Sequence, residues 1–145
     1  MGSAASNLVF EAVAEARLVV SAQTKFNPSD AEWDRWLMAV GNLEHQVQRV
    51  RLLVVTEGGH PTKQQLDRLR AVNKKNPPTA IVSRSLGLRV IGSALSFVNP
   101  TIRVFSPTHV EQAFDHLSLA PAERQLATSA MKRLERELGI LSAAG

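Results

Sequence analysis

The 145-residue sequence contains no cysteine, no tyrosine and only seven aromatic residues in total. The absence of cysteine excludes disulfide bridges, thiolate metal ligands and cysteine nucleophiles. Because so few aromatic rings leave no platform on which bases could stack, the sequence does not favour nucleic acid as a partner. It also lacks an apolar run of the roughly 20 residues that cross a bilayer, so we expect no membrane span.

The first six residues have neither the basic region nor the apolar core of a signal peptide. We therefore expect a loose tail over residues 1–6, a single domain over residues 7–141 and a cytoplasmic location. Hydrophobic residues make up 44% of the chain and charged residues 21%, which is typical of a folded globular domain.

Positive charge is concentrated in the middle of the chain, although the net charge is only +4. Residues 46–110 hold ten Lys or Arg residues against two carboxylates, Glu57 and Asp67. Such a basic block could meet nucleic acid or an acidic lipid surface, or it could be partly neutralised by the acidic first helix.

Hydrophobic periodicity indicates the first elements of the fold. Residues 8–13 and 17–23 alternate with a period of two, which predicts a hairpin, with a single helix over residues 8–22 as the rival interpretation. Ser29 and Glu32 have the spacing of a capping box, and the helix that follows carries an apolar stripe that includes both tryptophans. We expect the tryptophans to pack in the core.

The rest of the chain alternates between apolar runs and helical patterns. Residues 51–56 read as a central strand buried on both faces, followed by a helix from Thr62 with Leu66, Leu69 and Val72 inward. Further strands are expected over residues 79–82 and 101–105, each followed by a helix, and a last helix over residues 121–138. The fold class is therefore α/β: a mixed, mostly parallel four- to five-stranded sheet with its first strand antiparallel, helices on both faces and an extra C-terminal helix.

Polar residues follow each predicted parallel strand, and such strand ends meet at one edge of the sheet. Hydroxyl groups, an arginine and helix N-termini at this edge would suit a small anionic ligand. The same Ser and Thr residues are, however, the caps that helices need in any case. The candidates are Thr56, His60, Thr62, Ser83, Arg84, Ser85, Ser106 and His109.

No catalytic constellation is visible. His60, with Glu57 nearby, and His109 are the best acid–base candidates, but neither has a carboxylate in a triad order. Metal-ligand spacings and glycine-rich phosphate loops are lacking, so we predict no metal, no cofactor and no enzymatic activity.

One helix pattern suggests a contact surface. Small residues and an arginine recur at near-helical spacing after the strand at 79–82, and this stripe would let another backbone approach closely or would pack on the sheet. The stripe consists of Ser85, Arg89, Gly92, Ser93 and Ser96.

The order of elements resembles STAS domains, and within them the bacterial proteins grouped with the sporulation anti-sigma-factor antagonist. The resemblance spans residues 7–118 and is one of architecture and hydrophobic pattern. It is carried by Asp34 and Trp36 in the first helix, Val50-Arg51-Leu52-Leu53-Val54-Val55 as central strand, and Ile102-Arg103-Val104-Phe105 before Glu111-Gln112-Ala113.

The resemblance implies a non-enzymatic module that regulates partner proteins. Some members are switched by phosphorylation at the start of the helix after the central strand, and Thr62 occupies that position here. The family's Asp-Ser-Ser-Gly signature is replaced in this chain by Glu57-Gly58-Gly59-His60-Pro61-Thr62.

Two functional hypotheses follow. The first is a regulatory or scaffold module that binds another protein through the loop edge and the helix at residues 84–97, Arg89 included, with homo-oligomerisation left open. The alternative is a small-molecule or lipid binding domain with an anion site at the carboxyl ends of the strands, formed by Ser83, Arg84 and Ser85. An enzyme that uses His60 and Glu57 ranks below both.

Overall fold

The computed structural model describes residues 6–72, 76–90, 92 and 100–140. Its five strands form one sheet in the order β1-β2-β3-β4-β5. β1 runs antiparallel to β2, and all other neighbours are parallel. This confirms the predicted mixed, mostly parallel sheet. The strands are β1 (Leu8–Val13), β2 (Leu18–Gln23), β3 (Arg51–Thr56), β4 (Thr79–Ser83) and β5 (Ile102–Phe105).

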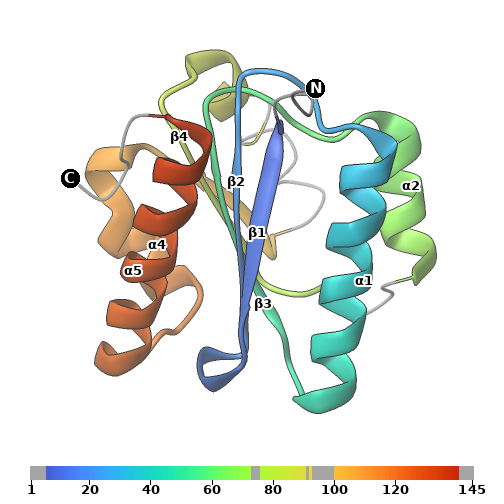
Figure 1. Ribbon diagram of the computed structural model, residues 1–145. Helices are drawn as coiled ribbons and strands as arrows, with labels where there is room; N and C mark the ends of the chain where they lie inside the picture. The colour runs from blue at the N-terminus through green and yellow to red at the C-terminus, as the bar shows by residue number, and fades with distance from the viewer. Residues whose placement is uncertain (1–5, 73–75, 91, 93–99, 141–145) are drawn as a thin grey trace.

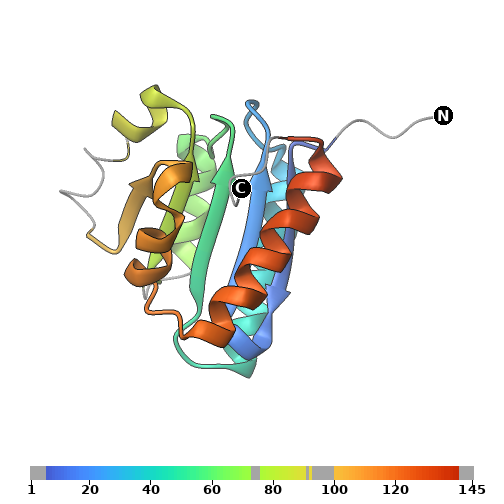
Figure 2. The same ribbon diagram turned by 90° about the vertical axis from the view of Figure 1, so that its left-hand side faces the viewer.

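Helices cover both faces of the sheet, as predicted. α1 (Asp30–Gln46) and α2 (Lys63–Val72) lie on one face, whereas α4 (Val110–His116) and the C-terminal α5 (Pro121–Leu138) lie on the other (Figures 1 and 2). Residues 86–90 are also helical and lie at the end of the sheet where the parallel strands finish. No helix in the described ranges is long and apolar enough to cross a membrane.

The first two strands form the predicted hairpin rather than a single helix. Their connection is a short 3-10 turn over Ala14–Ala16, after which Arg17 adopts a left-handed conformation with φ 50°. The backbone N–H of Arg17 donates to the carbonyl of Ala14 at 3.0 Å and closes the turn. This connection has none of the Gly or Asn residues that mark most tight hairpins.

The start of α1 is tied to the edge of the sheet by Glu32. Its backbone N–H donates to the Ser29 hydroxyl at 3.1 Å, and one carboxylate oxygen accepts from the Ser29 N–H at 2.9 Å, which confirms the capping box. The other oxygen accepts from the backbone N–H groups of Asn7 and Leu8. Burial acts to raise the pKa of Glu32, but these backbone hydrogen bonds outweigh it and hold the pKa below its usual value.

The two faces of the sheet are packed differently. On the α4/α5 face, alternate residues of β2, β3 and β4 are buried together with Phe114 and Met131. On the α1/α2 face, a second cluster joins β1, β2 and β3 to α1, and among the described residues it includes none from β4 or β5. This second cluster consists of Leu8, Val19, Trp33, Trp36, Val40, Leu43, Val50 and Leu52.

One predicted core position is wrong. Val72 is 65% exposed, whereas it was expected to face inward with Leu66 and Leu69. It shares a helical face with Gln65, which is 2% exposed, but it is the last residue of α2 and lies beyond Leu69, which still packs against the cluster of α1. The predicted inward positions Ile91, Leu95 and Val98 lie outside the described residues.

A candidate ligand cavity beside the strand ends

The carboxyl ends of β3, β4 and β5 lie side by side, as predicted. Thr56 pairs with Ser83, and Val82 pairs with Phe105, so the loops that leave these strands are neighbours. The loop after β2 joins them, because the N–H of Gly59 donates to the carbonyl of Thr24 at 2.9 Å. We call this edge, with loop residues 24–28, 57–62, 84–86 and 106–109, the rim.

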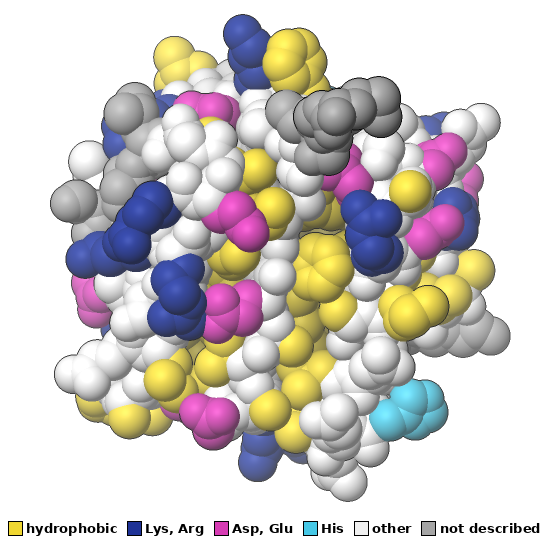
Figure 3. Space-filling view, in the orientation of Figure 1, with side chains coloured by type: hydrophobic (Ala, Val, Ile, Leu, Met, Phe, Trp, Pro, Cys, Tyr) yellow, Lys and Arg dark blue, Asp and Glu magenta, His cyan; other side chains and the backbone are white. Residues whose placement is uncertain are grey.

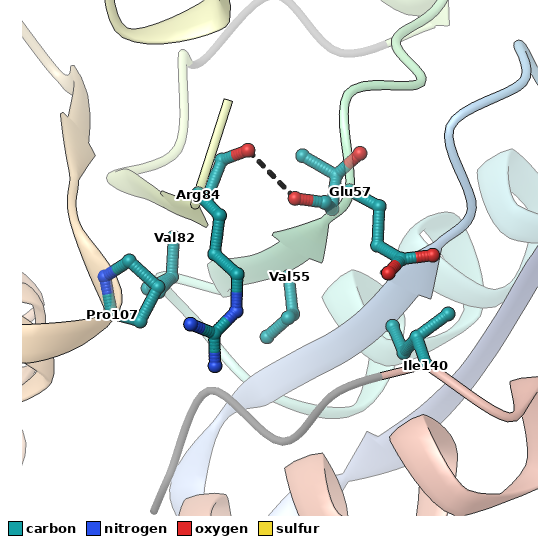
Figure 4. Close-up of a pocket in the computed structure, with 8 residues that line it drawn as sticks. Val55, Glu57, Val82, Arg84, Pro107 and Ile140 are labelled. Carbon is teal, nitrogen blue, oxygen red and sulfur yellow. Dashed lines mark hydrogen bonds between the residues drawn. The ribbon is translucent and has the colours of Figure 1, made fainter. Parts of the chain in front are cut away.

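The hydroxyl groups of Thr56 and Ser83 hold the rim together. Thr56 Oγ1 donates to the carbonyl of Gly59 at 2.6 Å and accepts from the N–H of Gly58 at 3.1 Å. Ser83 Oγ donates to the carbonyl of Thr56 at 2.7 Å, the bond dashed in Figure 4. It also accepts from the N–H of Ser85 at 3.1 Å. Both groups are buried and engaged with backbone, so their main role here is to fix the loops.

The remaining predicted hydroxyls act as helix caps or lie in a local cluster. Thr62 and Gln65 form the predicted capping box, with both hydrogen bonds at 3.0 to 3.1 Å. Ser85 Oγ accepts from the N–H of Leu88 at 3.2 Å, which identifies Ser85 as the cap of the next helix. Ser106 Oγ lies 2.9 Å from His109 Nδ1, and both residues are at the surface.

Neither candidate histidine is joined to a carboxylate by a hydrogen bond or ion pair within the described part of the chain. His60 is exposed, and its Nδ1 lies 3.0 Å from the carbonyl oxygen of Pro61. His109 contacts Ser106 instead. In the described ranges, no three His, Asp or Glu side chains gather where they could hold a metal ion.

Arg84 borders a small hollow of about 80 Å³ on the α4/α5 side of the rim. Figure 4 shows its guanidinium extending past Val82 between Pro107 and Val55, while the Glu57 carboxylate extends toward Ile140. The hollow is well below the roughly 300 Å³ at which ordinary small-molecule sites begin. It can hold a small ion or a few waters.

Within the predicted small-residue stripe, Gly92 packs on the sheet. A Cβ atom on Gly92 would lie 1.9 Å from Cγ2 of Val104, so the backbone at Gly92 lies directly against β5. The backbone N–H of Arg89 donates to the carbonyl of Ser85 at 3.1 Å, as in a helical turn. Ser93 and Ser96 lie outside the described residues.

A much larger cavity, about 540 Å³, lies on the α1/α2 face of the sheet. Its floor is formed by the residues of β2 to β5 that point to this face, and its sides by α1, α2 and the helical turn after β4. Apolar side chains dominate the walls: Leu8, Trp33, Trp36, Leu52, Val54, Leu66, Leu69, Ile81, Leu88, Ile102 and Val104.

The floor of this cavity shows an unusual burial pattern for a parallel sheet. Val54 and Ile81 lie on the inner strands β3 and β4, yet both are only partly buried. Inner parallel strands are ordinarily covered on both faces. The cavity is therefore an open stretch of apolar sheet that the described helices leave uncovered.

The first turn of α2 is fixed to α1 at one side of the cavity. The indole N–H of Trp33 donates to the carbonyl of Gln65 at 2.8 Å, and the Trp33 and Trp36 rings stack with centroids 4.6 Å apart. The side-chain amide of Gln65 donates to Pro28 and Asp30, both at 3.0 Å. These buried bonds set the spacing between the helices and keep this wall in place.

One buried polar group of the cavity is unsatisfied. Gln23, at the end of β2, lines the cavity and is only 4% exposed. Its side-chain oxygen accepts no hydrogen bond within the described part of the chain. A buried acceptor of this kind is uncommon in native proteins and marks a position where a ligand can donate.

The mouth of the cavity carries charged and polar side chains. His60 and Lys63 are exposed at the rim end, while Asp67 and Arg70 lie further along α2, 3.8 Å apart. The predicted site residues divide among these two spaces. The large cavity is lined by Thr56 and His60, and the small hollow by Thr56, Ser83 and Arg84. Neither space is lined by the remaining predicted residues, which are Thr62, Ser85, Arg89 and Ser106.

Sequence reasoning placed both tryptophans in the core, and they are buried, but it missed that they form a cavity wall. It also passed over Gln23 and Ser21, which both point to the cavity. The available signal was their period-two spacing in a strand beside the apolar central one, because polar residues on one face of an inner strand call for an explanation.

Three arginines of the basic block are paired with carboxylates. Arg51 pairs with Glu123 at 2.9 Å, Arg68 with Asp34, and Arg70 with Asp67.

Comparisons with protein-family models, with curated proteins and with solved structures found no match. The resemblance to STAS domains therefore stays a prediction.

Proposed function

We propose that this chain is a non-catalytic binding domain for a lipid-like molecule whose apolar body lies in the cavity and whose head group carries a hydrogen-bond donor. The observation that carries this proposal is the cavity itself, an opening of about 540 Å³ with predominantly apolar walls. Small-molecule sites span about 300 to 1,000 Å³ and combine apolar walls with a few polar groups. The cavity has both properties.

Gln23 supports a ligand with a donor. A buried acceptor without a partner costs on the order of 1–3 kcal/mol, which a hydroxyl or amide of the ligand would recover on binding. Gln23 lies at the rim end of β2, where Thr56 is its neighbour in β3. The head group would therefore lie at the rim, and the apolar body would extend over Val54 and Ile81.

The charges at the mouth favour a neutral or anionic head group over a cationic one. Lys63 is exposed at the rim end of the cavity, whereas the carboxylate of Asp67 is already paired with Arg70. This proposal keeps the predicted anion site near the strand ends but moves it from Ser83, Arg84 and Ser85 to the mouth formed by His60 and Lys63.

The regulatory role implied by the STAS resemblance is a separate prediction, as is phosphorylation of Thr62. The hydroxyl of Thr62 currently accepts the capping hydrogen bond from Gln65. A pull-down comparing the wild type with Arg89→Glu tests the protein-binding surface, and identical partner lists would remove it.

Intrinsic fluorescence provides a direct test, because the chain has no tyrosine and its only two tryptophans line the cavity. A long-chain alcohol with a terminal bromine should quench this emission in a saturable way. A matched methyl ether, which lacks the hydroxyl donor, should bind several-fold more weakly, and an alkylamine of the same length should also bind more weakly than the alcohol.

Two variants with the same substitution separate cavity binding from surface effects. Val54→Phe narrows the cavity and should abolish saturable quenching. Val72→Phe introduces the same ring at a 65% exposed position of α2 that does not line the cavity, and it should quench like the wild type. Linear, non-saturable quenching in all three proteins would overturn the proposed function.

A further inference from the structure

The two edge strands of the sheet, β1 and β5, differ in how well they are protected. β5 has only four residues, and its Arg103 is exposed; short length and charge both keep edge strands from pairing with other chains. β1 has six residues and contains no lysine and no proline. Its one charged residue, Glu11, is bonded to the Arg133 guanidinium of α5, with Nε 3.2 Å from the carboxylate. The edge at β1 is therefore the less protected one.

The hydrogen bonds of β1 show which of its backbone groups point away from the sheet. The N–H of Thr24 donates to the carbonyl of Asn7 at 3.0 Å, in line with the pairing of β1 and β2. Bonded pairs alternate along an antiparallel ladder, so the odd-numbered residues of β1 turn their N–H and C=O groups to β2. The even-numbered residues, Leu8, Phe10 and Ala12, turn theirs outward.

Only part of this outward edge is open. The carboxylate of Glu32 accepts from the outward N–H of Leu8 at 3.1 Å, so a further strand cannot pair there. At the other end the chain leaves the sheet in the turn Ala14–Ala16. Phe10 and Ala12 remain, each with one N–H and one C=O, and within the described part of the chain no loop or side chain bonds to these outward groups.

The open stretch is complementary to itself. In an antiparallel pair of two β1 strands about a two-fold axis, Phe10 of each copy can lie opposite Ala12 of the other, and all their outward groups then find partners. The side chains also match, because Phe10 is large and partly buried, whereas Ala12 is small, exposed and on the same face of the strand. A register with Phe10 opposite itself would place Ala12 against Leu8, whose N–H is already bonded to Glu32.

The surface around this edge is apolar. Figure 1 looks onto the edge, with β1 in front of the other strands, and Figure 2 shows β1 and β5 at opposite sides of the sheet. In Figure 3, which has the orientation of Figure 1, hydrophobic side chains gather in a band down the middle of this face, with charged side chains on either side. Contiguous apolar surface beside an open strand edge is a sign of an interaction site.

We infer that two copies of this chain associate through β1, so that their sheets join into one continuous sheet across a two-fold axis. Glu11 then lies opposite Glu11 of the second copy, and each carboxylate is held by Arg133 of its own chain, which offsets the repulsion between the two like charges. The interface goes beyond the proposed function and does not depend on it, because neither Phe10 nor Ala12 lines the cavity.

Sedimentation equilibrium of the full chain at micromolar concentration tests the inference, and we expect a dimer. Ala12→Pro removes an outward N–H without removing a bond to β2, and Ala12→Lys keeps the N–H but places a charge where Phe10 of the second copy lies. Each should raise the Kd of the dimer at least about tenfold, because a two-fold interface contains every change twice. A monomeric wild type would overturn the inference.

Ala71→Lys is the matched control, because Ala71 is exposed on α2 and lies outside β1. It should leave the Kd of the dimer unchanged. Circular dichroism checks that the variants remain folded, and Ala12→Lys, which keeps every backbone hydrogen bond of β1, decides the outcome if Ala12→Pro unfolds. A dimer of equal strength in Ala12→Lys, Ala71→Lys and the wild type would overturn the interface at β1.

Single cysteines test the register, since the chain contains none of its own. Opposite residues of a non-bonded antiparallel pair have Cα atoms about 4.5 Å apart, which suits a disulfide. Glu11→Cys should therefore form a covalent dimer under mild oxidation. Ala12→Cys should not, because its counterpart would lie about 8 Å away, and neither should Ala71→Cys. Cross-linking of Glu11→Cys no faster than that of Ala71→Cys would overturn the inference.

Discussion

The two faces of β4 differ sharply, although they belong to the same five residues. Ala80 and Val82 point toward α4 and α5 and are fully buried, whereas Ile81 lies between them in sequence, points to the cavity and is partly exposed. Side chains alternate between faces in every strand, so the strand itself treats both faces alike. The difference teaches that helix coverage, rather than strand composition, decides which side of this sheet is core and which is binding surface.

The largest expected effect comes from truncating neighbours on β3 that face opposite ways. Leu53 is completely buried under α4 and α5, so Leu53→Ala should lower the free energy of unfolding by about 2–5 kcal/mol. Val54→Ala, on the cavity floor, should lower it by about 1 kcal/mol or less. Urea denaturation measures both. Equal losses would mean that the cavity face is packed as tightly as the closed one.

The attachment of α1 to the sheet edge gives a pH-dependent effect. The pKa of Glu32 lies below its usual value, so the carboxylate stabilises the fold fully above the ordinary glutamate pKa, and this stability is lost as the pH falls through the lowered value. Glu32→Gln should cost about 1.5–3 kcal/mol at neutral pH, because hydrogen bonds to a charged acceptor are lost.

The informative comparison is the slope of stability against pH in the acid range. Glu32→Gln should lose less stability than the wild type between pH values of about 5 and 3. Glu123, whose pKa is lowered first by the N–H of Ala120 and also by Arg51, is present in both proteins and contributes to the remaining slope. Parallel curves for the two proteins would show that Glu32 is not held as described.

A smaller effect is expected at Gln23. Gln23→Leu removes a buried acceptor without a partner, so the ligand-free protein should become more stable by about 1 kcal/mol, as measured by thermal unfolding. The variant should also bind the long-chain alcohol and its methyl ether equally well. If the alcohol still binds more tightly than the methyl ether in Gln23→Leu, then a group other than Gln23 accepts the hydrogen bond from the hydroxyl of the ligand.

Much of the fold was predictable because its signals are local. The capping pairs Ser29 with Glu32 and Thr62 with Gln65, the alternation in β1 and β2, and the apolar run of β3 each depend on residues close in the sequence. The turn at Ala14–Ala16 carried no such signal, because its left-handed residue is Arg17 rather than glycine or asparagine.

The cavity was not predictable by the same means. Val54 belongs to an apolar run that is typical of a strand buried on both faces, and the sequence does not show which helices fail to reach it. The rim was placed correctly by topology, since parallel strands end at one edge. Its Ser and Thr residues cap helices or hold loops through hydrogen bonds to the backbone. The sequence alone does not distinguish such a residue from a ligand-binding one, because the distinction depends on its hydrogen-bond partners.

The most direct test of the central claim is a methyl NMR titration with the long-chain alcohol. Our account predicts that the methyl signals of Val54, Ile81, Ile102 and Val104 shift and saturate together, while those of Leu53, Val55 and Val82 on the closed face stay in place. Shifts of equal size on both faces, or none on the cavity face, would contradict it.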